Sequence, residues 1–193
     1  MLKTMFAGAV ALGALVGTAE AASPPPLYDW TGFYVGAFGG GLGGRTYEYA
    51  SGPSGLDAGL TFSYSWQAHG NWVFTPFVAV PLIHQTGEDS GFDTRIDWAV
   101  AAGLKLGVAM GRWQPYALVG GLVAGGSADD GGPTESNTHS GIMFGLGAEY
   151  ALTDRVSIGG RFVHIAVGEK EYFSVDRGWS GHSIAATVNF KLK

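Results

Sequence analysis

Apolar and polar residues alternate strictly along the final segment of the chain, residues 183–193. One face carries Ile184, Ala186, Val188, Phe190 and Leu192, and the opposite face carries Ser183, Ala185, Thr187, Asn189 and Lys191. A period of two predicts a β-strand with one apolar and one polar face. Because a sheet that stops at an open edge strand tends to aggregate, we expect this last strand to pair with the first and close a barrel.

Seven upstream segments have strand patterns: a first strand from Trp30, then residues 59–69, 72–83, 95–108, 113–124, 141–150 and 155–165. Short turns are expected at 69–71, 109–112 and 151–154, and long polar loops at 45–58, 85–93, 125–139 and 168–181. Pro76 and Pro81 predict a bulge or a break in the third strand, because proline lacks the N–H that a ladder needs. The pattern predicts an all-β protein, an eight-stranded antiparallel transmembrane β-barrel with its long loops outside the cell.

The second predicted strand shows most clearly which face meets lipid. Leu60, Phe62, Tyr64, Trp66 and Ala68 alternate with Thr61, Ser63, Ser65 and Gln67. A water-soluble lipocalin would place its apolar face inside, around a ligand, whereas large apolar side chains opposite small polar ones favour lipid outside and a narrow polar interior. We expect interfacial girdles from Trp66, Trp72, Trp98, Trp113 and Tyr150.

The N-terminus has the features of a secretory signal. Lys3 supplies a positive charge, an apolar run follows, and Ala19-Glu20-Ala21 forms an A-x-A cleavage site. An uncleaved membrane anchor is the alternative, but spanning a bilayer takes about 20 apolar residues and this run is shorter. We therefore expect a cleaved signal peptide at 1–21, a proline-rich tether at 22–29 and the barrel at 30–193.

Composition narrows the class further. The 193 residues include 33 glycines, 13% aromatic residues and only 14% charged residues, where soluble domains average about 25% charged residues. The absence of cysteine excludes disulfides, thiolate nucleophiles and cysteine metal sites. A net charge of −5 argues against a nucleic-acid partner.

Several short motifs occur along the chain: Pro24-Pro25-Pro26 with the segment from Tyr28 to Gly36, Ile96-Asp97-Trp98, Lys105-Leu106-Gly107, Arg112-Trp113-Gln114-Pro115-Tyr116, Gly147-Ala148-Glu149-Tyr150 and Val188-Asn189-Phe190. In this order they resemble the opacity-type outer-membrane β-barrel family of Alphaproteobacteria. The resemblance implies an eight-stranded, porin-like barrel with a surface or structural role. Two departures are Leu192 followed by Lys193 in place of a terminal aromatic residue, and Arg161 in place of the family's glutamate on the seventh strand.

Four charged residues fall on the inward face of the predicted strands: Asp97, Lys105, Glu149 and Arg161. They could form a proton or ion path, or a polar network that fills the lumen. Eight strands enclose a space just wide enough for side chains, and two acids can satisfy two bases there. We therefore expect a polar network and no open pore.

A catalytic reading rests on the seventh strand. The segment from Gly160 to His164 resembles the approach to the histidine of outer-membrane lipid A deacylases, which use a Ser-His-acid arrangement. That family has a serine two residues after the histidine, where this chain has Ala166. Without an activated hydroxyl no acyl-enzyme forms by this route, so no catalytic residue is assigned and no enzyme is expected.

Histidines gather at the expected long-loop rim. His84, His139, His164 and His182 all map to strand ends there, and only His69 maps to the other end. Hairpin pairing of the last two strands would bring His164 and His182 to one level and one face, where two imidazoles could bind a metal or haem. The alternative is that they are interfacial side chains among lipid phosphates. His164 and His182 are the candidate metal ligands, and no cofactor is assigned.

Together these observations predict a structural or surface-interaction barrel in the cell outer membrane. We expect a monomer that contacts outer-membrane lipids, lipopolysaccharide and the barrel insertion machinery, with no nucleic-acid partner. A haem-binding, metal-binding or adhesin barrel is the first alternative, and a lipid-modifying enzyme is the second.

Overall fold

The structure is a computed structural model that describes residues 27–46, 54–82, 85–89, 92–129, 135–172 and 175–192. The predicted signal peptide at 1–21 and most of the tether lie outside the described residues. Within the described ranges, no helix has the length and apolar character needed to cross a membrane.

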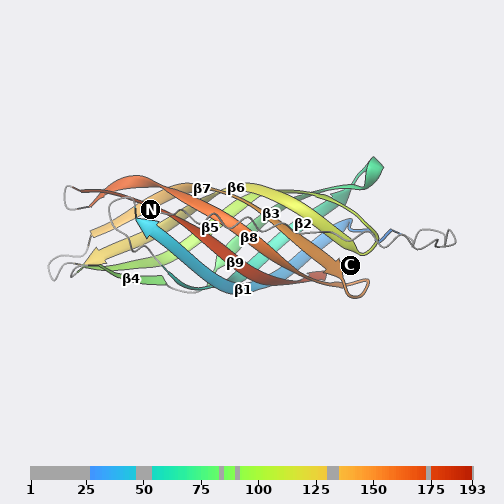
Figure 1. The fold of residues 1–193 in the computed structure, drawn as a ribbon, viewed down its shortest axis with the longest axis horizontal. Coiled ribbons are helices and arrows are strands. Elements are labelled where there is room, and N and C mark those ends of the chain that lie inside the picture. The colour runs from blue at the N-terminus through green and yellow to red at the C-terminus, as the bar shows by residue number, and fades with distance from the viewer. Residues whose placement is uncertain are drawn as a thin grey trace, which may run out of the picture.

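The chain forms a closed, all-β antiparallel barrel (Figure 1). The strands are β1 (Gly32–Thr46), β2 (Gly55–Gln67), β3 (Trp72–Pro81), β4 (Gln85–Asp89), β5 (Phe92–Val108), β6 (Trp113–Asp129), β7 (Glu135–Ala151), β8 (Val156–Tyr172) and β9 (Val175–Lys191). β3 and β4 pair with successive parts of β5, so together they fill one strand position and the ring has eight strands. The expected closure is confirmed, because β9 pairs with β1 from Tyr34↔Lys191 to Thr46↔Trp179.

The strands reach further toward the long-loop end than the alternation predicted. β1 and β2 take in both ends of the expected loop 45–58, and β4 occupies part of the expected loop 85–93. The expected loops 125–139 and 168–181 are likewise largely strand. These boundaries were wrong because main-chain ladder bonds do not need apolar side chains, and the strands continue through glycine and acidic residues.

The predicted short turns are confirmed. A 3₁₀ turn spans His69–Asn71, where Gly70 and Asn71 have φ values of 76° and 68°. Gly111 takes a φ of 63° between β5 and β6. The β2–β3 pairing passes from Ser63↔Phe77 to Trp66↔Phe74 in unchanged register, so the ladder is interrupted beside Pro76 without a bulge.

Side chains divide between the two faces as the alternation predicts. The outward face carries large exposed apolar residues, among them Phe62, Trp66, Leu104, Val119, Ile142, Phe144, Leu146, Ile184 and Phe190. The expected girdle residues Trp66, Trp72 and Trp113 are exposed at the short-turn end, where Trp113 packs on Tyr150 with ring centroids 4.9 Å apart. Trp98, toward the other end, is also exposed. An apolar exterior of this kind is the surface that faces lipid.

The interior is less polar than the alternation predicted. One buried cluster of Phe38, Phe77, Ala79, Tyr116, Leu118, Met143, Val163 and Ala185 occupies the lumen. Glycines make room for these side chains. A Cβ on Gly59, the strand partner of Phe38, would lie 2.7 Å from that ring, and a Cβ on Gly120 would lie 2.9 Å from the methyl carbon of Met143. Each would also lie within about 2.5 Å of a backbone carbonyl oxygen on an adjacent strand.

Candidate functional site

The short-turn end of the lumen is plugged by Trp30. Its side chain is only 1% exposed and packs with Val73, Ala109 and Ala151. Its backbone N–H donates to Gln67 Oε1 at 2.9 Å, and the hydroxyl of Tyr34 donates to its carbonyl at 2.9 Å. Trp30 was predicted only as the start of the first strand, because nothing in the local pattern indicates that the chain folds into the barrel mouth.

The residues just before Trp30 are tied to the same rim. The backbone N–H of Tyr28 donates to the carbonyl of Gly111 at 3.1 Å, and its hydroxyl donates to the carbonyl of Asp154 at 2.9 Å. Lys191 Nζ donates to the carbonyl of Asp29 at 2.6 Å. The Asp29 carboxylate accepts the backbone N–H of Thr31 at 2.9 Å, and this bond holds the pKa of Asp29 below its ordinary value. This segment therefore closes the short-turn rim.

A polar layer lies next to the plug. Lys105 Nζ donates to Glu149 Oε1 at 2.8 Å, and Ser157 Oγ donates to Glu149 Oε2 at 3.2 Å. Ser65 and Thr75 share a hydrogen bond of 2.9 Å in the same layer. The structure thus brings together Lys105 and Glu149, two of the four predicted inward charges, as a pair that fills the lumen.

Of the other two predicted charges, one has no described side chain and one lies elsewhere in the lumen. The side chain of Asp97 lies outside the described residues, and its backbone sits at a register shift between Ile96 and Trp98. Arg161 points inward as predicted but lies deeper in the apolar cluster, with its Cζ 4.0 Å from the centroid of the Phe38 ring. Among the described side chains, Arg161 is therefore outside the expected network, and the membership of Asp97 stays a prediction.

Asp57 is an inward charge that the sequence reasoning missed. It lies on β2, in a segment predicted as loop, is 9% exposed and accepts a hydrogen bond from the Ser183 hydroxyl. A signal was present, since Asp57 continues the period-two series through Gly59, Thr61 and Ser63 on the polar face.

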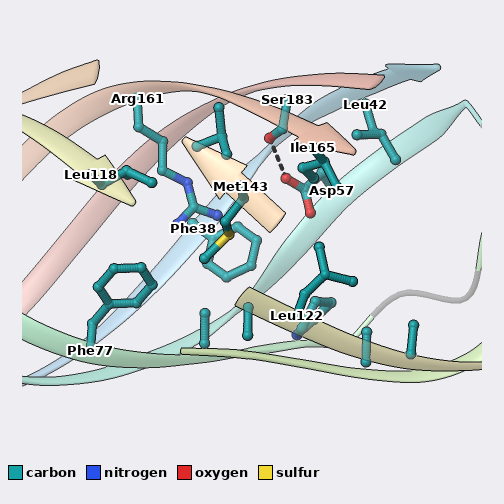
Figure 2. A pocket seen from close by; sticks show the side chains of 16 residues that line it. Phe38, Leu42, Asp57, Phe77, Leu118, Leu122, Met143, Arg161, Ile165 and Ser183 are labelled. Atoms are coloured by element: carbon teal, nitrogen blue, oxygen red, sulfur yellow. Dashed lines mark hydrogen bonds between the residues drawn. The ribbon is translucent and has the colours of Figure 1, made fainter. Parts of the chain in front are cut away.

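A cavity of about 100 Å³ occupies the long-loop half of the lumen (Figure 2). Most of its lining is apolar, including Phe38, Leu118, Leu122, Met143, Val163 and Ile165. The polar side chains that reach it are Asp57, Arg161 and Ser183. Pockets that are mostly apolar with a few placed polar groups are the usual form of small-molecule sites.

The two candidate metal ligands meet as the hairpin pairing predicted. His164 and His182 are direct partners in the β8–β9 ladder, and their Nδ1 atoms are 3.2 Å apart. Both lie on the outward face, in phase with the exposed Phe162 and Ile184. Phe144 contacts the His164 ring at 4.9 Å between centroids, and Phe162 stacks on His182 at 5.4 Å. The two histidines and these two phenylalanines therefore form a cluster of aromatic rings on the barrel exterior.

The remaining histidines do not join this cluster. His84 lies outside the described residues, and His69 is in the short turn at the other end, as predicted. His139 pairs with Ala124 and shares the lumen-facing side of β7 with Met143. Among the described residues, no three His, Asp or Glu side chains are grouped so as to hold a metal ion.

The deacylase arrangement is likewise incomplete. Ala166 follows His164 on the same face of β8, and its ladder partner is Ser180. Within the described part of the chain, the ring nitrogens of His164 and His182 bond to each other and to no serine hydroxyl or carboxylate. The group that would activate a nucleophile is therefore not assembled around either histidine.

A closed ring of tilted antiparallel strands with a lipid-facing exterior, short turns at one end and a filled lumen defines an outer-membrane β-barrel. A family model described as the outer membrane protein beta-barrel domain matches residues 8–191. The chain belongs to this family, and its location is the outer membrane of a Gram-negative cell.

Relatives agree with this assignment. The chain is 24% identical over 233 residues to the 31 kDa outer-membrane immunogenic protein of Brucella melitensis, with 99% of this chain and 97% of the relative covered. Neisserial surface protein A has a similar structure, with a TM-score of 0.64 at 16% identity over 84% of this chain and 98% of that one. Ail, the attachment invasion locus protein of Yersinia pestis, has a TM-score of 0.50 at 14% identity over 83% and 99%. At these identities the two structures show the shared fold alone.

Proposed function

We propose that this protein is a non-conducting barrel with a structural and surface-interaction role, anchored in the outer membrane and exposing its long-loop end to the cell exterior. The observation that carries this proposal is the filled lumen. Trp30 plugs one end, the Lys105–Glu149 pair crosses the next layer, and Arg161 stacked on Phe38 crosses the third. These three layers support a barrel without a continuous path for ions.

Conductance measurements test the obstruction. The refolded mature chain in a planar lipid bilayer should give no discrete current steps. A Trp30→Ala variant should also stay silent, because the other two layers remain in place. Stepwise currents from the wild-type barrel would contradict the proposal, and so would a channel opened by Trp30→Ala alone.

Cysteine labelling tests the orientation, since the native chain has no cysteine. Ser54 is exposed at the long-loop end of β2, and Thr153 is exposed in the short turn between β7 and β8. A membrane-impermeant maleimide added to intact cells should label a Ser54→Cys variant and leave Thr153→Cys unlabelled until the cells are lysed. The reverse pattern would invert the topology. The name of the Brucella relative, an immunogenic outer-membrane protein, supports a surface-reaching end.

A second candidate function is metal or haem binding by His164 and His182. The 3.2 Å contact between their Nδ1 atoms supports it, because two adjacent imidazoles at one level are a suitable start for a transition-metal or haem site. Ligation requires neutral rings, so binding should weaken as the pH falls and the histidines become protonated.

Absorbance titrations with haem and equilibrium dialysis with Zn²⁺ test this candidate. The refolded protein should retain either probe at neutral pH, and a His164→Ala, His182→Ala double variant should lose it. A His69→Ala variant, altered at the opposite end of the barrel, is the matched control and should bind normally. Equal retention by the double variant would leave the two histidines as interfacial residues.

A further inference from the structure

Two opposite charges face the lumen cavity without contacting each other. Arg161 on β8 and Asp57 on β2 both line it, and Figure 2 shows them on either side of the Phe38 ring. Within the described part of the chain, the ion pairs are Lys105–Glu149 and Arg112–Asp154, so Arg161 and Asp57 form none. Nε of Arg161 has no hydrogen-bond partner among the described residues.

This arrangement is unusual for an interior filled only for stability. A half-buried guanidinium whose Nε lacks an acceptor carries a desolvation cost that the stacking on Phe38 offsets only in part. Asp57 has a partner in Ser183, yet its charge also stays uncompensated by a direct cation. Unpaired polar groups in an apolar pocket are the usual recognition elements of a ligand site.

The cavity also sets the size and shape of a ligand. A dry apolar cavity of about 150 Å³ accommodates benzene, so the space of about 100 Å³ beside Leu118 and Met143 takes only the hydrocarbon part of a ligand, about four carbons, and the charged groups of that ligand must lie at its polar edge, against Arg161 and Asp57. The Lys105–Glu149 layer and the Trp30 plug close the short-turn side. A ligand would therefore enter from the long-loop end.

We propose that the long-loop half of the lumen binds a small zwitterion with an apolar side chain, of the class of the aliphatic α-amino acids. The ligand carboxylate accepts hydrogen bonds from Arg161, its ammonium group donates to Asp57, and its hydrocarbon part fills the cavity beside Met143. A net-neutral zwitterion matches one fixed cation and one fixed anion, whereas an anion alone would face Asp57 and a cation alone would face Arg161. This inference goes beyond the structural role, because a barrel that does not conduct can still hold a ligand.

NMR of methionine methyl groups provides a direct readout on the refolded mature barrel. Met143 lines the cavity, while Met110 lies in the short turn at the opposite end and serves as the internal reference. L-Leucine should shift the Met143 signal saturably and leave the Met110 signal unchanged. Two probes with the same skeleton, 4-methylpentanoate and 3-methylbutylamine, each lack one charge and should bind at least about thirtyfold more weakly.

Three variants separate the parts of the site. Arg161→Met and Asp57→Asn should each weaken leucine binding by at least about thirtyfold. Ala101→Leu, which keeps both charges and fills the cavity, should abolish the Met143 shift. Heat-modifiable migration on detergent gels verifies that each variant is folded. If a larger substitution prevents folding, Asp57→Asn still tests the proposal, because asparagine has nearly the same shape as aspartate.

The proposal is overturned if leucine leaves the Met143 signal unmoved up to its solubility limit. It is equally overturned if either single-charge probe binds as tightly as leucine, or if the folded Ala101→Leu barrel still responds. None of these outcomes affects the conductance or labelling tests of the structural role.

Discussion

Removal of the Glu149 carboxylate should destabilise the barrel strongly, because it leaves Lys105 charged and unpaired in the lumen. The two side chains are 12% and 8% exposed, and Lys105 Nζ lies 2.8 Å from Glu149 Oε1. Ser157 would lose its acceptor at the same time. Breaking a buried ion pair by removing one partner typically costs about 3–5 kcal/mol, so we expect Glu149→Leu to lower the free energy of unfolding by that amount.

The double variant Lys105→Met, Glu149→Leu should recover most of this loss. Replacing both members of a buried pair by apolar residues of similar volume is often neutral or stabilising. The double-mutant cycle should therefore give an interaction energy of at least about 2 kcal/mol. Urea-induced unfolding of the barrel in lipid vesicles, followed by tryptophan fluorescence and gel mobility, measures each free energy.

The exposed pair of Arg112 and Asp154 is the matched control. Their nearest charged atoms are 3.5 Å apart and their side chains are 45% and 89% exposed. A surface ion pair contributes about 0–1 kcal/mol, so Asp154→Ala should change the unfolding free energy by less than about 1 kcal/mol. A loss of that small size for Glu149→Leu, with no recovery in the double variant, would refute the assignment of Lys105 and Glu149 as a buried, mutually dependent pair.

Three further predictions concern packing, lipid contact and pH. Gly59→Ala puts a Cβ 2.4 Å from the backbone carbonyl oxygen of Val80 and 2.7 Å from the Phe38 ring, and it should cost about 1–3 kcal/mol in unfolding free energy. Gly39→Ala meets nothing within 4 Å and should change that free energy by less than about 0.5 kcal/mol. Leu146→Arg, at a lipid-facing position that is 65% exposed, should cost about 2–4 kcal/mol in vesicles if it lies near the bilayer midplane, and full tolerance would reverse the faces. Asp29→Asn should lower stability above the ordinary carboxyl pKa of 3.8, and the difference from wild type should vanish as the pH falls through the lowered pKa of the folded protein.

The period-two alternation predicted the ring of strands and its two faces because lipid outside and side-chain packing inside impose opposite demands on successive residues. Strand ends were less predictable. From Gly55 to Gly59 the alternation and the main-chain ladder both continue, with Leu56 exposed and Asp57 buried, but glycine and polar residues in this stretch are equally typical of a loop. Asp57 was missed for this reason.

The alternation predicted which side chains face the lumen, but it did not predict which of them contact one another. Alternation places Lys105, Glu149 and Arg161 inside, but strand tilt and register decide which of them share a layer. The pairings that fix those layers join residues far apart in sequence, such as Lys105 and Glu149. The Trp30 plug depends on the same long-range geometry, because it requires the chain before β1 to turn into a mouth that forms only when the ring is closed.

The position of Arg161 connects the structural role with the proposed ligand site. If a carboxylate formed an ion pair with Arg161, the pair would make a second polar layer across the lumen, and the long-loop half would offer a ligand no unpaired charge. Asp57 instead accepts a hydrogen bond from Ser183, and Arg161 stacks on Phe38, so the two charges line the same cavity without forming an ion pair. The short-turn half, with its paired charges and tryptophan plug, supplies the stability of the barrel. The groups of the proposed ligand site are therefore concentrated in the long-loop half of the lumen.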